Sequence, residues 1–219
     1  DLACGTGSFM ALMQEKGWKV TGVDQSASML AIAEEKLRPL KGDYRLFLQD
    51  LRELAVDEEF PLITCLCDSL NYLLLAGDLH QVLTLMYAHL LPGGIGIADF
   101  NSPYKYREIL GENTFCTVFE NSAYIWSNYL ESTGRLCRME IDFFHRDSGD
   151  LFRHFKETHW QRWYEPAEIR ELAEKVGFQE VSCFGGFTHR PCQPEDERFF
   201  FVFAKGSRND TLTAEQHIL

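Results

Sequence analysis

The sequence lacks several features, and each absence excludes a class of protein. In its 219 residues no apolar run approaches the ~20 that a membrane-spanning helix needs, and its first residues do not form a charged-then-apolar signal segment. None of the seven cysteines has a partner at CxxC spacing, which disfavours a zinc site or a disulfide framework. The formal net charge is −12, and the sequence contains no block of lysines or arginines. The negative field of such a protein repels phosphate backbones.

These absences favour a cytoplasmic protein with reduced thiols, no metal ion and no membrane contact. The expected partner is a small molecule and not a nucleic acid, and a homodimer is compatible with the sequence. Hydrophobic residues make up 45% of the chain, enough for one α/β domain with a sizeable core and an insertion.

Helix and strand patterns alternate over the first part of the chain. Apolar runs predict strands at 20–23, 44–48, 62–67 and 95–100. The segments between them have a helical period, and we expect Asp78 to cap the helix before the last of these strands. Such alternation predicts an α/β fold with a Rossmann-like, doubly wound and mostly parallel sheet.

The pattern changes after the fifth strand. Between residues 115 and 164 there is no helical period, and aromatic and β-branched runs predict an antiparallel β insertion. A helix at 165–176 and strands at 181–184 and 199–204 are expected to complete the main sheet.

The predicted organisation has three parts. Residues 1–104 and 165–205 are expected to form one α/β domain, residues 105–164 an inserted antiparallel β subdomain, and residues 206–219 a polar tail. The chain opens on what reads as the end of a first strand. We therefore expect that strand to be truncated here and the natural protein to be longer, because an open edge inside a parallel sheet would be costly.

A glycine-containing turn follows that first strand. The segment D-L-A-C-G-T-G at 1–7 places glycines where the backbone can approach a ligand at a helix N-terminus. Asp24 ends the next strand 17 residues after Gly7, and an acid about 20 residues beyond such a turn binds ribose hydroxyls. A glycine pair also occurs for tight packing alone, but the spaced acid favours nucleoside binding.

Two details separate this turn from a dinucleotide fingerprint. The pattern G-x-G-x-x-G/A needs a small third residue, and Met10 takes that place here, which disfavours close packing over a pyrophosphate. Asp1 would repel a pyrophosphate but would suit the ammonium of a methionine moiety. A nicotinamide-dependent oxidoreductase is therefore the alternative and not the first choice.

Four segments together resemble the motifs of class I S-adenosylmethionine-dependent methyltransferases. In chain order they are D-L-A-C-G-T-G at 1–7, G-V-D-Q-S-A-S-M-L at 22–30, Q-D-L at 49–51 and L-L-P-G-G at 90–94. Through its topology, the insertion resembles the small-molecule branch with glycine N-methyltransferase-like and amino-sugar N,N-dimethyltransferase-like enzymes. The resemblance implies S-adenosyl-L-methionine as cofactor, S-adenosyl-L-homocysteine as product, and in-line methyl transfer to a small-molecule amine or hydroxyl. A non-catalytic S-adenosylmethionine-binding protein stays open as a further alternative.

The resemblance also implies cofactor roles for particular residues. Asp24 would take the ribose hydroxyls, Met29 would pack along the adenine, and Asp50 would read the adenine amino edge. Plain helix core is the alternative for Met29, and a turn that ends a strand is the alternative for Asp50. The implied cofactor-binding residues are Asp1, Ala3, Cys4, Gly5, Gly7, Asp24, Gln25, Met29, Asp50, Leu51 and Asp68.

The acceptor side is expected after the fourth strand and in the insertion. Ligand crevices of open α/β sheets lie beyond the carboxyl ends of the strands, so Asn71 and Tyr72 are substrate candidates, with Trp126 from the aromatic-rich insertion. Asp68 could instead cap a helix. Candidate bases are Asp68, His145, His154 and His159, and because the sequence favours none of them the catalytic residues stay unknown. No metal site is expected.

Overall fold

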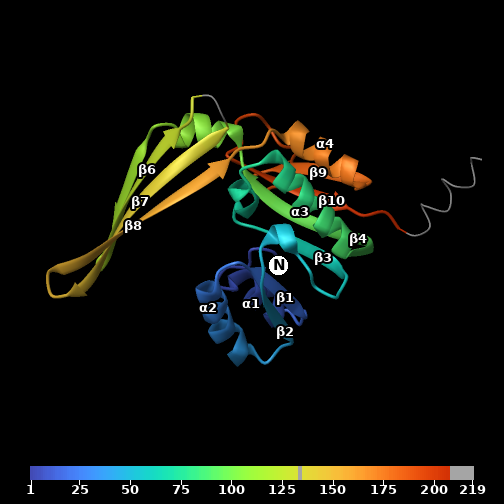
Figure 1. Cartoon of the computed structure of the whole chain (residues 1–219), viewed down its shortest axis with the longest axis horizontal. Coiled ribbons are helices and arrows are strands. Elements are labelled where there is room, and N and C mark those ends of the chain that lie inside the picture. Colours follow the sequence, from blue (N-terminus) through green and yellow to red (C-terminus); the bar gives the residue numbers. More distant parts are fainter. Residues whose placement is uncertain (133–134, 208–219) are drawn as a thin grey trace, which may run out of the picture.

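A mixed sheet forms the centre of the computed structural model, which describes residues 1–132 and 135–207 (Figure 1). Its strands are β1 (Val20–Asp24), β2 (Tyr44–Leu48), β3 (Phe60–Cys65), β4 (Leu90–Asn101), β9 (Glu180–Gly185) and β10 (Arg198–Ala204). β1 pairs in parallel with β2, β3 pairs in parallel with β4, and β10 lies antiparallel between β4 and β9. Leu2 forms parallel bridges to Val23 and Cys65 and so joins the two groups of strands.

Helices cover this sheet in two pairs. α1 (Ser8–Glu15) packs on α2 (Ala27–Leu37), and α3 (Ala76–His89) packs on α4 (Pro166–Val176). Local sequence explains where α2 and α4 begin and end. Ser26 caps α2 by accepting a hydrogen bond from the Met29 N–H, and Gly177 ends α4 in the left-handed conformation.

Short helices connect several of these elements. They are η1 (Arg38–Leu40), η2 (Leu51–Glu53) and η3 (Ser69–Tyr72), and a π-helix, η4 (Lys105–Leu110). The sequence did not predict η4, which links the main sheet to the insertion. Its buried side chains Tyr106 and Leu110 pack with Trp163 in a small core of their own, which holds the root of the insertion against the body.

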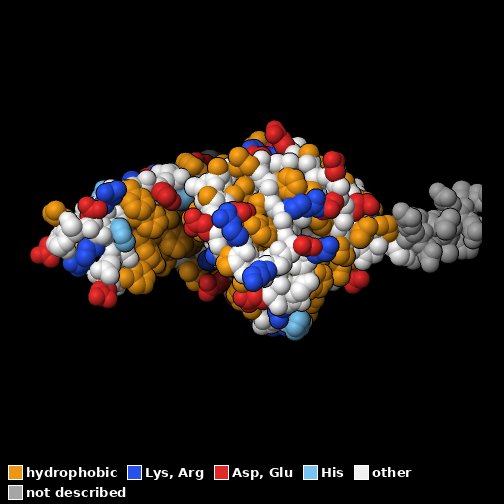
Figure 2. All heavy atoms as spheres, turned by 90° about the horizontal axis from the view of Figure 1, so that it is seen from below, with side chains coloured by type: hydrophobic (Ala, Val, Ile, Leu, Met, Phe, Trp, Pro, Cys, Tyr) orange, Lys and Arg blue, Asp and Glu red, His pale blue; other side chains and the backbone are white. Residues whose placement is uncertain are grey.

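The insertion is an antiparallel sheet in the order β5-β6-β7-β8. Its strands are β5 (Thr114–Val118), β6 (Ser122–Leu130), β7 (Leu136–Ser148) and β8 (Leu151–Arg162). The sheet projects from the body as a long arm (Figure 1). Hydrophobic side chains gather on the part of the arm that lies beside the body (Figure 2).

The predicted α/β fold and the antiparallel insertion are confirmed, with differences at several boundaries. Asp78 does not cap α3, because the helix begins at Ala76 after the extended residue Leu75. The L-L-P-G-G segment belongs to β4, where a register shift against β3 accommodates it. Of the expected polar tail, residues 208–219 lie outside the described residues.

Among the helices of the described ranges, none is long and apolar enough to span a bilayer.

Candidate functional site

The glycine loop connects Leu2 to α1 at the carboxyl edge of the sheet. Ala3, Gly5 and Gly7 have positive φ angles of 52°, 53° and 70°, a region that residues with a side chain rarely adopt. A Cβ at Gly7 would lie 3.0 Å from the Cβ of Ala33, whereas a Cβ at Gly5 would meet nothing within 4 Å. Gly7 therefore lets the loop pack on α2, and Gly5 presents its backbone to open space.

Asp24 fixes this loop from the end of β1. Its Oδ2 accepts a hydrogen bond from the Gly5 N–H at 2.8 Å, and its Oδ1 accepts one from the Ser26 N–H at 2.8 Å. The residue is only 8% exposed, so these bonds hold the carboxylate in one orientation. A carboxylate has about four acceptor positions, and both oxygens therefore keep capacity for the hydroxyls of a ligand.

Exposed apolar side chains lie next to Asp24. Met29 in the first turn of α2 is 42% exposed, and Leu48, which is paired with Asp24 in the sheet register, is 59% exposed. Met29 is therefore not helix core, a role that Ala33 and Leu37 fill. Apolar surface beside a hydroxyl-binding carboxylate suits a flat ring attached to a sugar.

Asp50 is engaged by a neighbour that the sequence analysis missed. The Arg52 side chain donates to both carboxylate oxygens, at 2.9 and 2.6 Å, and its guanidinium also lies 3.5 Å from Asp78. The hydrogen bonds from Arg52 lower the pKa of Asp50. Asp50 thus begins η2 as a charged, oriented acceptor, and any contact with a ligand would be shared with Arg52.

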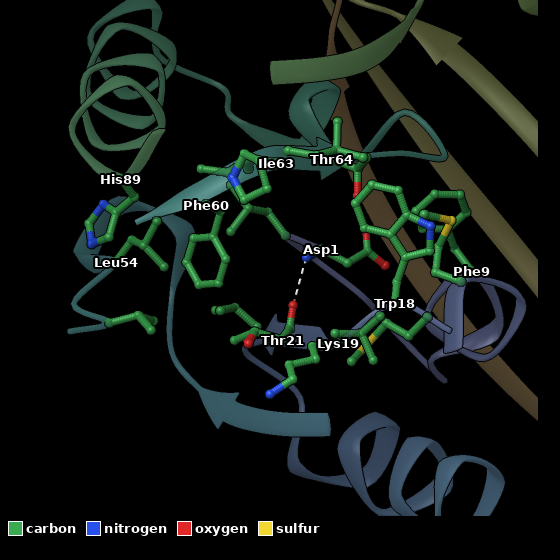
Figure 3. A pocket seen from close by; sticks show the side chains of 18 residues that line it. Asp1, Phe9, Trp18, Lys19, Thr21, Leu54, Phe60, Ile63, Thr64 and His89 are labelled. Carbon is green, nitrogen blue, oxygen red and sulfur yellow. Dashed lines mark hydrogen bonds between the residues drawn. The ribbon is translucent and has the colours of Figure 1, made fainter. Parts of the chain in front are cut away.

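A separate pocket opens at the opposite, amino edge of the sheet (Figure 3). The first residues of two strands, Val20 and Phe60, help to line it. Asp1 lines it too, and its carboxylate accepts a hydrogen bond from Thr64 Oγ1 at 2.7 Å. Ligand crevices of such sheets lie at the carboxyl edge, so this pocket is not the candidate site.

The loop after β3 is strained. Cys67 and Asp68 are consecutive non-glycine residues with positive φ angles of 60° and 50°. Each costs about 1–2 kcal/mol, and strain of this kind concentrates at functional sites. The Asp68 side chain makes no cap bond to η3, so the alternative role of helix cap is not what the structure shows.

A charged network holds Asp68 in place. Arg198 at the start of β10 donates to Asp68 Oδ1 at 2.7 Å and also binds Asp99. Gln161 of β8 donates to Asp68 Oδ2 at 2.8 Å, and the Tyr106 hydroxyl donates to Gln161 at 2.7 Å. Asp99 is 1% exposed, and burial raises its pKa while Arg198 opposes that rise. The network ties the arm to the end of the sheet.

Asn71 differs from its expected role. It is 0% exposed, and its amide accepts from the Asn101 N–H at 2.9 Å and donates to the Arg162 carbonyl at 2.8 Å. The expectation of a substrate contact is therefore corrected, because the side chain is fully used in fastening η3 to β4 and β8.

A junction pocket lies between the carboxyl ends of the central strands and the arm. Its lining residues are Asp68, Tyr72, Asn101, Lys105, Leu110, Trp126, Met139, Ile141, His159, Gln161 and Arg198. The Lys105 ammonium donates to Asn101 Oδ1 at 3.0 Å, and burial and the nearby Arg198 lower its pKa. The Trp126 indole nitrogen is buried and has no hydrogen-bond partner in the described part of the chain. The pocket thus offers a cation, and the buried indole nitrogen of Trp126 stays without a partner.

The candidate bases differ in whether they line the junction pocket. Asp68 and His159 line it, whereas His145 lines a different pocket of the arm. His154 pairs with Asp142 at 2.7 Å and does not line the junction pocket. The sequence could not have made this choice, because it depends on how the arm folds back on the body.

The two other charged residues of the network, together with Gln161 and Tyr106, escaped the sequence analysis, although one of the charged residues left a signal. Asp99 is a lone acid inside the apolar run of β4, and acids are rarely buried without a partner. That pattern could have indicated a buried ion pair. Arg198 gave no comparable signal, since its contacts join residues about a hundred positions apart in the chain.

The carboxyl-edge features fit a nucleoside whose tail lies along the glycine loop. Asp24 offers acceptors for hydroxyls, Met29 and Leu48 offer apolar surface for a base, and the space beside Gly5 would be reduced by any side chain. This donor and acceptor set agrees with the cofactor that the motifs imply.

Comparison with known proteins agrees with this cofactor. A family model described as "Methyltransferase domain" matches residues 1–94. The chain is 34% identical over 219 residues to "Putative methyltransferase YqeM" of Bacillus subtilis (strain 168), and the match covers 98% of this chain and 85% of that protein. It is 24% identical to dTDP-3-amino-3,4,6-trideoxy-alpha-D-glucopyranose N,N-dimethyltransferase of Streptomyces venezuelae, over 85% of this chain and 77% of that protein. The crystal structure of an S-adenosylmethionine-dependent methyltransferase from Clostridium acetobutylicum ATCC 824 matches with a TM-score of 0.86 at 32% identity, over 94% of this chain and 83% of that one.

Proposed function

The chain belongs to the S-adenosylmethionine-dependent methyltransferases, and from this membership we propose that it methylates an amine or hydroxyl of a small molecule held in the junction pocket. The cofactor's sulfonium supplies an activated methyl group when bound. The residues of the chain therefore have to align the acceptor with that methyl group and exclude water.

One observation carries this proposal. Leu2 pairs with Val23 on one side and with Cys65 on the other, so the glycine loop, Asp24 and the strained loop after β3 leave adjacent strands at one edge. The junction pocket begins at Asp68 of that loop. A cofactor on the first two features would present its reactive end toward a molecule in the pocket.

On the cofactor side, the proposal keeps the residues that the motifs imply, except Asp1. Asp24 would hold the ribose, and Gly5 and Gly7 would let the methionine end approach the backbone. Met29 and Leu51 would contact the adenine, with Asp50 acting together with Arg52. The remaining members of the set are Ala3, Cys4, Gln25 and Asp68. Asp1 is left out of the proposal, because its carboxylate lines the pocket at the amino edge and is bonded to Thr64.

On the acceptor side, an amine is the first choice. The relative from Streptomyces venezuelae is named as an N,N-dimethyltransferase of an amino sugar, and the pocket contains a carboxylate, Asp68, together with Tyr72 and Trp126. Lys105 adds a cation for an anionic part of the acceptor. The net charge of −12 supports a small acceptor over a nucleic acid.

We extend the proposal to the organisation of the chain. Residues 1–104 and 165–205 would bind the cofactor, and residues 105–164 would shape the acceptor site, since Trp126 and His159 of the arm line the junction pocket. A cytoplasmic location is part of the proposal, because the seven cysteines are free thiols and suit a reducing compartment.

The test is transfer of a labelled methyl group from S-adenosyl-L-methionine to a panel of amino sugars, nucleotide-linked amino sugars, amino acids, simple amines and alcohols. We expect labelled product and S-adenosyl-L-homocysteine with at least one small amine. Parallel arms contain bulk RNA and a denatured protein mixture. Transfer in those arms alone would overturn the small-molecule assignment.

A further inference from the structure

Tyr72 and His159 meet across the junction pocket from two parts of the chain, η3 and β8. Their rings pack edge to face with centroids 5.9 Å apart. Tyr72 Oη lies 3.4 Å from His159 Nδ1, and His159 Nε2 lies 3.0 Å from Glu157 Oε2. A hydroxyl, an imidazole and a carboxylate are thus joined in one line.

The chemistry of the three groups determines which atom donates and which accepts in each of these hydrogen bonds. An ionised carboxylate only accepts hydrogen bonds, so Glu157 assigns the proton of a neutral His159 to Nε2. Nδ1 is then left as an acceptor toward the Tyr72 hydroxyl. The order matches the general arrangement in which a carboxylate orients the imidazole that accepts a proton from a hydroxyl.

Tyr72 and His159 lie where the proposed acceptor would bind. Tyr72 is 47% exposed, and Tyr72 and His159 both line the junction pocket. Other charged or titratable groups around them are already engaged. Arg198 binds Asp68 and Asp99, Lys105 donates to Asn101, and Tyr106 donates to Gln161. His159 is therefore the imidazole at this pocket whose acceptor nitrogen faces the Tyr72 hydroxyl.

We infer that Tyr72, His159 and Glu157 form a proton relay that takes the proton from the acceptor atom as it is methylated; this inference rests on the proposed function. The acceptor N–H or O–H gives its proton to Tyr72 Oη while the Tyr72 proton passes to His159 Nδ1. The acceptor atom forms its bond to the methyl carbon, and the methyl–sulfur bond breaks with its electron pair left on sulfur. The imidazolium that results lies beside the Glu157 carboxylate, and His159 later returns the proton to solvent.

Because Tyr72 gives up its own proton as it receives the acceptor's proton, it does not have to exist as a phenolate before the reaction. Burial and the nearby Asp68 raise the pKa of Tyr72, so a free phenolate at this position would be disfavoured. Tyr72 is thus the residue that touches the acceptor, His159 receives the proton, and Glu157 is a positioning residue.

The test compares Tyr72→Phe, His159→Asn and Glu157→Gln with His154→Asn. The control removes a similar histidine–carboxylate pair from the same strand, because His154 pairs with Asp142 away from the pocket. For the acceptor that the wild type uses, we expect kcat to fall by roughly 10²–10³-fold in the first two variants, as for a lost general base. Glu157→Gln should lower kcat by about tenfold, and His154→Asn should leave it unchanged. The affinity for S-adenosyl-L-methionine, measured by calorimetry, should stay within about twofold in all four and serves as the folding control.

The pH profile separates a relay from a structural role. The kcat of the wild type should fall on acidification, because a protonated His159 cannot accept the proton, and this acidic limb should be absent in His159→Asn. Wild-type turnover with unaltered rates and profiles in the variants would overturn the relay alone. Normal cofactor binding with no methyl transfer by the wild type to any member of the panel would instead overturn the proposed function, and the relay with it.

Discussion

At the scale of single residues, Asp24 has the largest expected effect on cofactor binding. Asp24→Ala should weaken S-adenosyl-L-methionine binding by about 1–3 kcal/mol, because it removes charge-assisted bonds to ribose and the bond that orients Gly5. Asp43→Asn is the matched control, since the Asp43 carboxylate lies in an exposed pair with Lys19. Calorimetric affinities check both, and an unchanged affinity in Asp24→Ala would remove Asp24 from the site.

Gly7 tests the packing of the loop on α2. Gly7→Ala should destabilise the fold through both its φ of 70° and its 3.0 Å approach to Ala33. Gly149→Ala has a similar φ of 55° with nothing within 4 Å, so it measures the backbone cost alone, about 1–2 kcal/mol. Urea unfolding should show a larger loss for Gly7→Ala, and equal losses would mean that the Ala33 contact does not matter.

The sequence predicted some of these residues and not others. Asp24 and the glycine loop were predictable because their spacing is local and fixed by a strand–turn–helix unit. The burial of Asn71 and the pairing of Asp50 with Arg52 were not predictable, because side-chain partners depend on the folded arrangement.

At the scale of elements, the Arg198 network joins β10 to the end of β4 and to the arm. Arg198→Met leaves Asp99 as a buried carboxylate without its partner, and loss of one member of a buried pair costs about 3–5 kcal/mol. Asp99→Asn together with Arg198→Met should recover part of this loss, because the unpaired charge is gone. A double variant as unstable as Arg198→Met alone would contradict the buried-charge explanation.

The same variant has a predictable pH dependence. Burial already raises the pKa of Asp99 in the folded protein, and losing Arg198 would raise it further. A group whose pKa is higher in the folded than in the unfolded state binds more protons when folded, so the stability it contributes falls as pH rises. The free energy of unfolding that Arg198→Met loses relative to the wild type, measured with urea, should therefore be smaller near pH 5 than near pH 8. An equal or larger loss at pH 5 would contradict this explanation.

Most helices and strands were predictable because their signals are periodic and local. α4 has a proline in its first turn and a glycine after its last, and both limits agree with the sequence. The π-helix η4 was not predictable, because its register is fixed by Tyr106 and Leu110 packing against Trp163 of the arm root. The prediction of Asp78 as a helix cap was wrong, because an acidic residue in the first turn of a helix looks like a cap in the sequence.

At the scale of the whole molecule, the proposed cofactor site and the junction pocket lie at one edge of the sheet. The alternation of strands and helices predicts the sheet and its carboxyl edge, but it does not indicate where the arm folds back. That position is set by contacts between distant residues, such as the Asn71 bond to Arg162 and the Gln161 bond to Asp68. The arrangement of the glycine loop and Asp24 could therefore be predicted from sequence, whereas the lining of the junction pocket required the structure.

The most direct test of the account is a calorimetric titration of the protein with S-adenosyl-L-methionine, S-adenosyl-L-homocysteine and NADH in parallel. We predict micromolar binding of the first two ligands, weakened by about 1–3 kcal/mol in Asp24→Ala and unchanged in Asp43→Asn, and no binding of NADH. Binding of NADH without either of the other ligands would contradict the assignment of the carboxyl-edge site to S-adenosyl-L-methionine.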